Sequence, residues 1–137
     1  MLNVTVAIKA DKKRVKRFYK QQAYSASFLG DDVCYLLVDA TDQIIASVIV
    51  SYQHQCPFLH ALVVAKPYRN QGIASKLLQH CQQQHRTITC FAKRDLRGFY
   101  LRHGFVVCAS GHIDNSLSSR YARYVIKQPD LLIFAYG

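Results

Sequence analysis

Residues 62–78, LVVAKPYRNQGIASKLL, decide the fold because they join an apolar strand to a helix through a turn with one glycine. The apolar residues after the turn recur at helical spacing: Ile73, Leu77, Leu78 and Cys81. Gly72 stands where a Ser or Asp N-cap is ordinarily found, so the first-turn amides lack a side-chain acceptor. Those amides carry the positive end of the helix dipole and predict an anion site. The alternative is a tight corner that needs glycine for its backbone alone.

The composition favours one folded domain over residues 1–137. Half of the 137 residues are apolar and 19% are charged, which excludes global disorder. No apolar stretch is long enough to span a membrane. The N-terminal segment carries its charge after a short apolar alternation, the reverse of a secretory signal, so we expect a cytoplasmic protein.

The charge balance favours anionic partners. The net charge is +10, from 18 basic and 8 acidic residues, and every acidic residue is an aspartate. This excess of positive charge is compatible with three kinds of anionic partner: nucleic acid, a membrane surface and a polyphosphate ligand. The five cysteines form no C-x-x-C pair, which indicates reduced thiols and no metal site.

The pattern of strands and helices predicts a mixed sheet. Apolar runs and alternation predict strands at 2–8, 33–38, 44–52, 58–64, 87–92, 105–109 and 131–136. Helices are predicted at 12–23, 73–84, 96–103 and 116–127, with N-caps at Asp11, Asp95 and Asn115 and a left-handed Gly104 after the third. We therefore expect an α+β fold in which helices cover both faces of a mixed, mostly antiparallel sheet of six to seven strands.

Two segments carry a family resemblance. The turn resembles the acyl-CoA-binding motif Q/R-x-x-G-x-G/A of the GNAT acyltransferase superfamily, with Arg69, Gly72 and Ala74 at its defining positions. Residues 98–105, GFYLRHGF, resemble the superfamily's F-Y-x-x-x-G-F segment. The order and spacing of the two motifs fit as well, and the resemblance covers nearly the whole chain.

The resemblance implies acetyl-CoA as cosubstrate and an N-acetyltransferase activity, without a metal. The pyrophosphate of acetyl-CoA would be held by the turn and the start of the helix, which comprise Arg69, Asn70, Gln71, Gly72, Ile73, Ala74 and Ser75. The pantetheine arm would pair with the backbone of Leu62, Val63 and Val64 where the sheet opens. A strand amide there would polarise the thioester carbonyl, a role worth roughly 3 kcal/mol per donor.

Proton transfer has two candidate side chains. Many superfamily members use a glutamate as base, which this chain lacks. His60 is the next candidate, because its stretch is similar to that of arylalkylamine N-acetyltransferases, in which strand histidines relay the amine proton; ordered water is the alternative. The resemblance makes Tyr100 the general acid for the thiolate. Lys93 stands where many relatives have an asparagine cofactor contact, and a lysine there would suit a phosphate.

The acceptor is not defined by any motif. We expect a small amine or protein amine, in a groove formed by the first helix, the loop around 24–32, the loop at 52–57 and residues 108–120. Asp31 and Asp32 are candidates to orient the amine. Direct attack is favoured over a cysteine-linked intermediate because neither motif contains a cysteine. The alternative functions are a non-catalytic acyl-CoA sensor and a basic nucleic-acid-binding module, although nucleic acid is the less favoured partner. We expect no membrane partner. The sequence is compatible with a homodimer.

Overall fold

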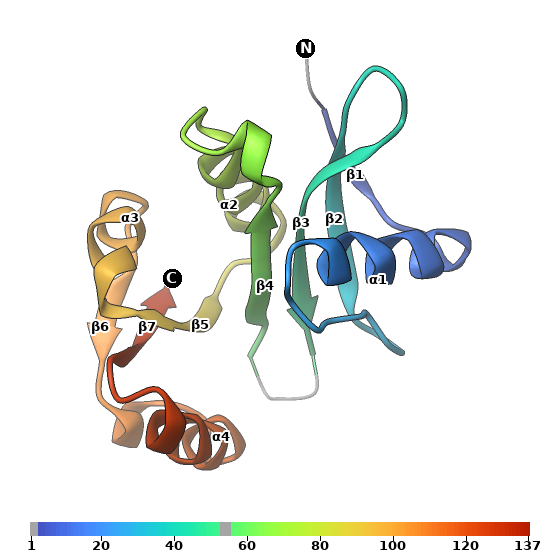
Figure 1. Ribbon diagram of the computed structural model, residues 1–137. Coiled ribbons are helices and arrows are strands. Elements are labelled where there is room, and N and C mark those ends of the chain that lie inside the picture. Colours follow the sequence, from blue (N-terminus) through green and yellow to red (C-terminus); the bar gives the residue numbers. More distant parts are fainter. Residues whose placement is uncertain (1–2, 53–55) are drawn as a thin grey trace.

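The computed structural model describes residues 3–52 and 56–137. Its strands form one sheet in the order β1-β2-β3-β4-β5-β7-β6 (Figure 1). The strands are β1 (Val4–Val6), β2 (Val33–Val38), β3 (Ile44–Ser51), β4 (Phe58–Val64), β5 (Ile88–Lys93), β6 (Val106–Cys108) and β7 (Leu131–Tyr136). The α-helices are α1 (Lys12–Gln21), α2 (Ile73–Gln84), α3 (Arg97–Arg102) and α4 (Asn115–Lys127). All strand pairs are antiparallel except β4 with β5, which confirms the predicted mixed α+β fold.

Asp11 occupies the N-cap position of α1, as predicted, although its side chain is used elsewhere, whereas the prediction of Asp95 as a cap was wrong. Asp11 makes no cap bond to α1; its carboxylate accepts from the Ile8 amide at 2.8 Å and pairs with Arg14 at 3.0 Å. Asp95 lies inside a 3-10 turn, η3 (Arg94–Leu96), so the helix starts later than predicted and without a side-chain cap. The first helix is also shorter than predicted, because the chain turns left-handed at Ala23.

The third cap was wrong by one residue. Asn115 is the first helical residue of α4, and Asp114 caps the helix by accepting from the amides of Ser116 and Leu117. Gly104, by contrast, has a φ of +81° after α3, as predicted. Short polar side chains near a helix start therefore indicated the helix but not always its cap.

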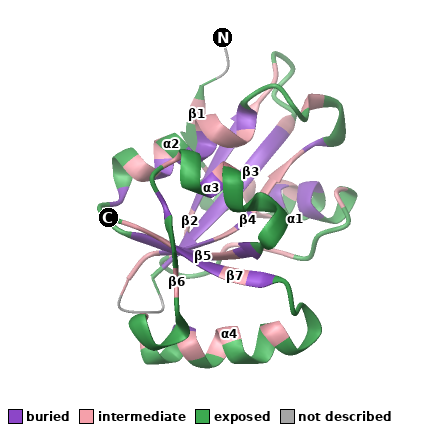
Figure 2. Cartoon of the chain, turned by 90° about the vertical axis from the view of Figure 1, so that its left-hand side faces the viewer, coloured by how far each residue is buried: buried purple, intermediate pink, exposed green. Residues whose placement is uncertain are grey.

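Helices cover both faces of the sheet. On one face, Val15, Phe18 and Tyr19 of α1 pack on β2 and β3. On the other face, Leu77 and Leu78 of α2 are fully buried against the sheet, each stabilising the fold by about 1.5–3 kcal/mol. Figure 2 places most buried residues on the strands, while α4 is almost wholly exposed or half-buried. None of the described helices is long and apolar enough to cross a membrane.

The sheet splits between β4 and β5. Over the described residues these strands pair only at Phe58 with Thr89 and at Leu59 with Cys90, and they then diverge (Figure 1). The same part of β4 contains a bulge, because Ile49 pairs with His60 whereas Ser47 pairs with Val63. Among the described strands, none pairs with this edge of β4 along its remaining length.

The bulge centres on Ala61, whose φ of +57° is unusual for a residue with a side chain. The hydroxyl of the fully buried Tyr19 donates to the Ala61 carbonyl at 2.7 Å and contacts Ser47 Oγ at 2.9 Å. This bond ties α1 to the bulge and fixes the geometry of β4 at the split.

Candidate active site

The turn between β4 and α2 has two left-handed residues, Asn70 (φ +64°) and Gly72 (φ +76°). The side chain of Gln71 donates to the Pro67 carbonyl at 3.3 Å, and Arg69 Nε donates to the Val64 carbonyl at 3.0 Å. The turn is therefore braced from both sides by its own side chains. The Val64 contact was not foreseen, because Arg69 was expected only as part of an anion site.

The start of α2 fits an anion. Gly72 is its N-cap, and no side chain from the described residues caps it, as the sequence predicted. A Cβ at Gly72 would meet nothing within 4 Å, so the space beside the backbone is open. Residues 69–72 are exposed, Ala74 and Ser75 are half-buried, and only Ile73 turns its side chain into the core. The backbone amides have the charge and access that a phosphate requires.

The predicted thioester-binding segment lies beside the split. Leu62, Val63 and Val64 follow the last β4–β5 pair and are half-buried. Leu62 and Val64 pack on the core under α2, whereas Val63 packs on the core under α1. Their side chains thus belong to the two cores, which leaves the strand backbone for contacts along the split.

His60 lies on β4 at the bulge, on the α1 face. Its Nε2 lies 2.8 Å from Ser51 Oγ, and its ring stacks on Phe58 with centroids 5.7 Å apart. Burial lowers the pKa of His60 below its ordinary value, Arg120 acts in the same direction, and Asp32 opposes them. The imidazole is therefore neutral at pH 7 and able to accept a proton.

Tyr100 lies on α3, on the opposite face of the sheet. It is 4% exposed, stacks on Phe134 and interacts with the Cys90 thiol. Burial first, and Cys90 second, raise the pKa of Tyr100 well above its ordinary value, so the phenol stays protonated. Because Cys90 pairs with Leu59 next to His60, the two candidates flank the last β4–β5 pair from opposite faces.

A pocket of about 400 Å³ opens on the α1 face beside His60. It lies between the loop that follows α1, strands β4 and β5, and helix α4. Residues that line it include Tyr24, Phe58, His60, Phe91, Arg120 and Tyr124. Two of the segments expected to form the acceptor groove, the loop around 24–32 and the segment ending at 120, contribute to this pocket, whereas no described lining residue comes from α1. Residues 53–55 of the expected 52–57 loop lie outside the described residues.

Sequence reasoning missed the contribution of the residues after 120. Arg120, Tyr124 and Gln128 all line the pocket, and their spacing of four residues places them on one face of a helix. That spacing was a signal available in the sequence. Asp32 is used differently from the expectation, because its carboxylate accepts from the Leu29 amide at 3.0 Å and lies outside the described lining of this pocket. Lys93 ends β5 and is exposed.

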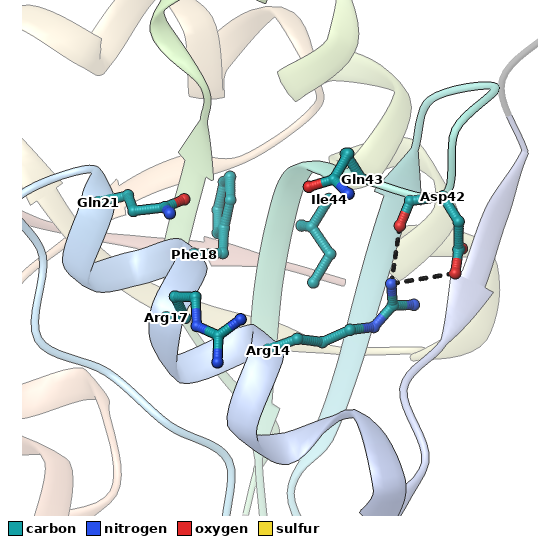
Figure 3. A pocket seen from close by; sticks show the side chains of 7 residues that line it. All are labelled: Arg14, Arg17, Phe18, Gln21, Asp42, Gln43 and Ile44. Atoms are coloured by element: carbon teal, nitrogen blue, oxygen red, sulfur yellow. Dashed lines mark hydrogen bonds and ion pairs between the residues drawn. The ribbon is translucent and has the colours of Figure 1, made fainter.

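A smaller cavity of about 190 Å³ lies between α1 and the β2–β3 loop (Figure 3). Arg14 crosses it to the backbone carbonyl and carboxylate of Asp42, at 2.8 and 3.4 Å. The same guanidinium also pairs with Asp11. Arg14 therefore holds the β2–β3 loop against α1. We interpret this cavity as part of the packing between α1 and the loop.

The comparisons with known proteins agree with the two motifs. A family model described as the acetyltransferase (GNAT) domain matches residues 6–119. The chain therefore belongs to the GNAT acetyltransferase family. No curated protein matches the chain.

Solved structures of acetyltransferases share the fold. The ribosomal-protein-S18-alanine N-acetyltransferase from Escherichia coli has a TM-score of 0.72 at 14% identity, with 99% of this chain and 93% of that chain covered. An acyl-CoA N-acyltransferase from Pseudomonas aeruginosa has a TM-score of 0.67 at 16% identity, with both chains covered completely.

N-acetylglutamate synthase from Neisseria gonorrhoeae, complexed with coenzyme A and N-acetyl-glutamate, has a TM-score of 0.75 at 11% identity. That likeness covers 99% of this chain but 35% of the synthase chain, so this chain spans about a third of the synthase's length. At these identities the likenesses concern the fold alone.

Proposed function

We propose that this chain is an acetyl-CoA-dependent N-acyltransferase that acts by direct attack of an amine. The observation that carries the proposal is the split between β4 and β5, which begins at His60, directly after the pair of Leu59 with Cys90; β4 then leads to the uncapped start of α2. An extended arm can pair with the edge of β4 beyond its last described pair with β5, and the uncapped helix start suits the phosphates of that arm. Acetyl-CoA supplies the activated acyl group as a thioester.

The cosubstrate would be held mainly by backbone groups. The amides of residues 70–75 would bind the pyrophosphate, because they are exposed or lie beside open space. The backbone of Leu62, Val63 and Val64 would align the pantetheine arm, and an amide among them would polarise the carbonyl. Arg69 would brace this arrangement through its bond to Val64 rather than act as a phosphate ligand alone.

His60 would remove the proton from the attacking amine. An alkylammonium has a pKa near ~10.4, so only its deprotonated form attacks. The imidazole borders the pocket at which an amine would arrive, and its lowered pKa keeps it unprotonated. Ser51 Oγ orients the ring through Nε2.

Tyr100 would donate the proton that the departing thiolate needs. Its phenol is kept protonated by burial and interacts with Cys90, which belongs to the last described β4–β5 pair. The amine proton and the thiol proton would therefore move on opposite faces of the sheet. Because the imidazole is neutral and the phenol is protonated at pH 7, one group can act as base and the other as acid.

The first test measures binding and turnover separately. A thermal-shift titration with acetyl-CoA should stabilise the protein, and an amine panel should release free thiol. No stabilisation at saturating acetyl-CoA would refute every acyl-CoA role for the chain. Stabilisation without turnover of any amine would favour a non-catalytic acyl-CoA sensor instead.

A further inference from the structure

The wall of the pocket beside His60 is built from aromatic rings. Phe58 and Phe91 meet edge to face with centroids 4.8 Å apart, and Tyr124 meets Phe91 in the same way at 6.2 Å. Tyr24 closes the pocket from the loop after α1. Such a wall favours an apolar or aromatic group on the molecule that binds there.

Arg120 brings a positive charge into this aromatic pocket. Its guanidinium carbon lies 5.6 Å from the centroid of the Phe58 ring. Among the described residues Arg120 forms no ion pair, and no aspartate is among the described lining residues. A half-buried guanidinium without a carboxylate partner favours an anionic group on the ligand, which a planar fork binds in bidentate fashion.

The amine site and the anion site are close together. The Phe58 ring contacts both His60, as a stacked partner, and Arg120, as a cation–π partner. The charge of Arg120 is also felt at the His60 imidazole. Both residues also line the same pocket, so a ligand bound there can present an amine to His60 and an anion to Arg120, as an amino acid does.

We propose that the acceptor is the α-amino group of an aromatic or large apolar α-amino acid, with Arg120 as the residue that binds its carboxylate. This inference rests on the proposed N-acyltransferase function. The amine nitrogen forms a bond to the acyl carbon and loses a proton, while the carbon–sulfur bond breaks and the thiolate takes a proton. Polyamines are disfavoured, because the described lining offers no carboxylate for a second cation.

The experiment compares L-phenylalanine with phenethylamine, which has the same ring and amine but no carboxylate, and with spermidine. Free thiol release should give L-phenylalanine a kcat/KM at least tenfold above that of phenethylamine, with spermidine lowest. Arg120→Gln should lower kcat/KM for L-phenylalanine by about tenfold to hundredfold and leave phenethylamine nearly unchanged. Arg123→Gln, at an exposed position on the same helix outside the described pocket lining, is the matched control and should change neither.

A binding measurement makes the result independent of turnover. N-acetyl-L-phenylalanine should raise the melting temperature of the wild type and of Arg123→Gln, but not that of Arg120→Gln. Arg120→Lys, which keeps the charge but loses the planar fork, serves as a second variant in case the glutamine variant does not fold, and should retain part of the preference.

The outcomes separate the two proposals. If acetyl-CoA neither stabilises the protein nor acylates any amine, the proposed function itself fails. If acetyl-CoA binds but phenethylamine or spermidine is used as well as L-phenylalanine, the substrate inference is overturned and the acyltransferase remains. The substrate inference would also be overturned if the Arg120 variants lost kcat/KM equally for L-phenylalanine and phenethylamine. It would likewise be overturned if N-acetyl-L-phenylalanine did not change the melting temperature of the wild type.

Discussion

Gly72→Ala tests the anion site with the smallest change that the chain allows. Gly72 has a φ of +76°, and an alanine there costs roughly 1–2 kcal/mol of backbone strain. Nothing lies within 4 Å of the new methyl group, so no clash adds to that cost. For a chain of this length we expect the melting temperature to fall by about 3–8 °C.

The effect on acetyl-CoA should be larger than the strain alone explains. The methyl group would enter the open space beside the first-turn amides of α2, where the pyrophosphate is proposed to bind. Losing one charge-assisted hydrogen bond costs about 1.5–3 kcal/mol. The dissociation constant for acetyl-CoA, measured by isothermal titration calorimetry, should therefore rise about tenfold to hundredfold.

Gly30→Ala is a matched control for the backbone strain. Gly30 also has a positive φ, +53°, and a methyl group there also meets nothing within 4 Å. It lies in the loop between α1 and β2, away from the start of α2. This variant should lose similar stability and keep its acetyl-CoA affinity. An unchanged affinity in Gly72→Ala, or an equal loss in both variants, would refute the proposed pyrophosphate site.

Three further substitutions test the chemistry and the bulge. Tyr100→Phe should lower the rate of acetyl transfer by about 10²–10⁴-fold in the thiol-release assay while the acetyl-CoA thermal shift persists; an unchanged rate would remove Tyr100 as the acid. Because burial raises the pKa of Tyr100, the wild-type pH–rate profile should also show no loss of this acid below about pH 10. His60→Ala should abolish the acidic limb of that profile, in which the rate rises as His60 loses its proton. Because burial lowers the pKa of His60, the midpoint of this limb in the wild type should lie below pH 6.5. An acidic limb that survives the substitution would belong to another group. Tyr19→Phe leaves the Ala61 carbonyl without its buried donor. Urea denaturation should therefore give a free energy of unfolding lower by about 1–3 kcal/mol than that of the wild type. An unchanged free energy of unfolding would show that the bond does not stabilise the bulge.

The order of strands and helices was predictable because it depends on local periodicity. Alternation and apolar runs located every strand of the described sheet, and the two glycines at 72 and 104 marked left-handed turns that glycine adopts at little cost. The caps were less predictable, since Asp11 and Asn115 each had a competing neighbour. Local patterns indicate where a helix begins but do not rank nearby hydrogen-bond partners.

The pocket beside His60 was only partly predictable, because it forms from segments far apart in the chain. The spacing of Arg120 and Tyr124 indicates one helix face, but nothing local says that this face meets Phe58 and Phe91. That meeting depends on the position of α4 after β6 and on the exchange of β6 and β7 in the sheet order. Both are tertiary features that local propensity does not encode.

The bulge at Ala61 links the split to the pocket. In a regular strand, neighbouring side chains point to opposite faces, yet His60 and Ala61 both line the pocket. The left-handed Ala61 makes this possible, at a cost of about 1–3 kcal/mol that the buried Tyr19 bond offsets in part. An alanine at φ +57° gives no signal in the sequence, unlike a glycine. The residue that positions the proposed base is therefore one that only the folded chain reveals, and its supporting tyrosine comes from a helix more than forty residues away.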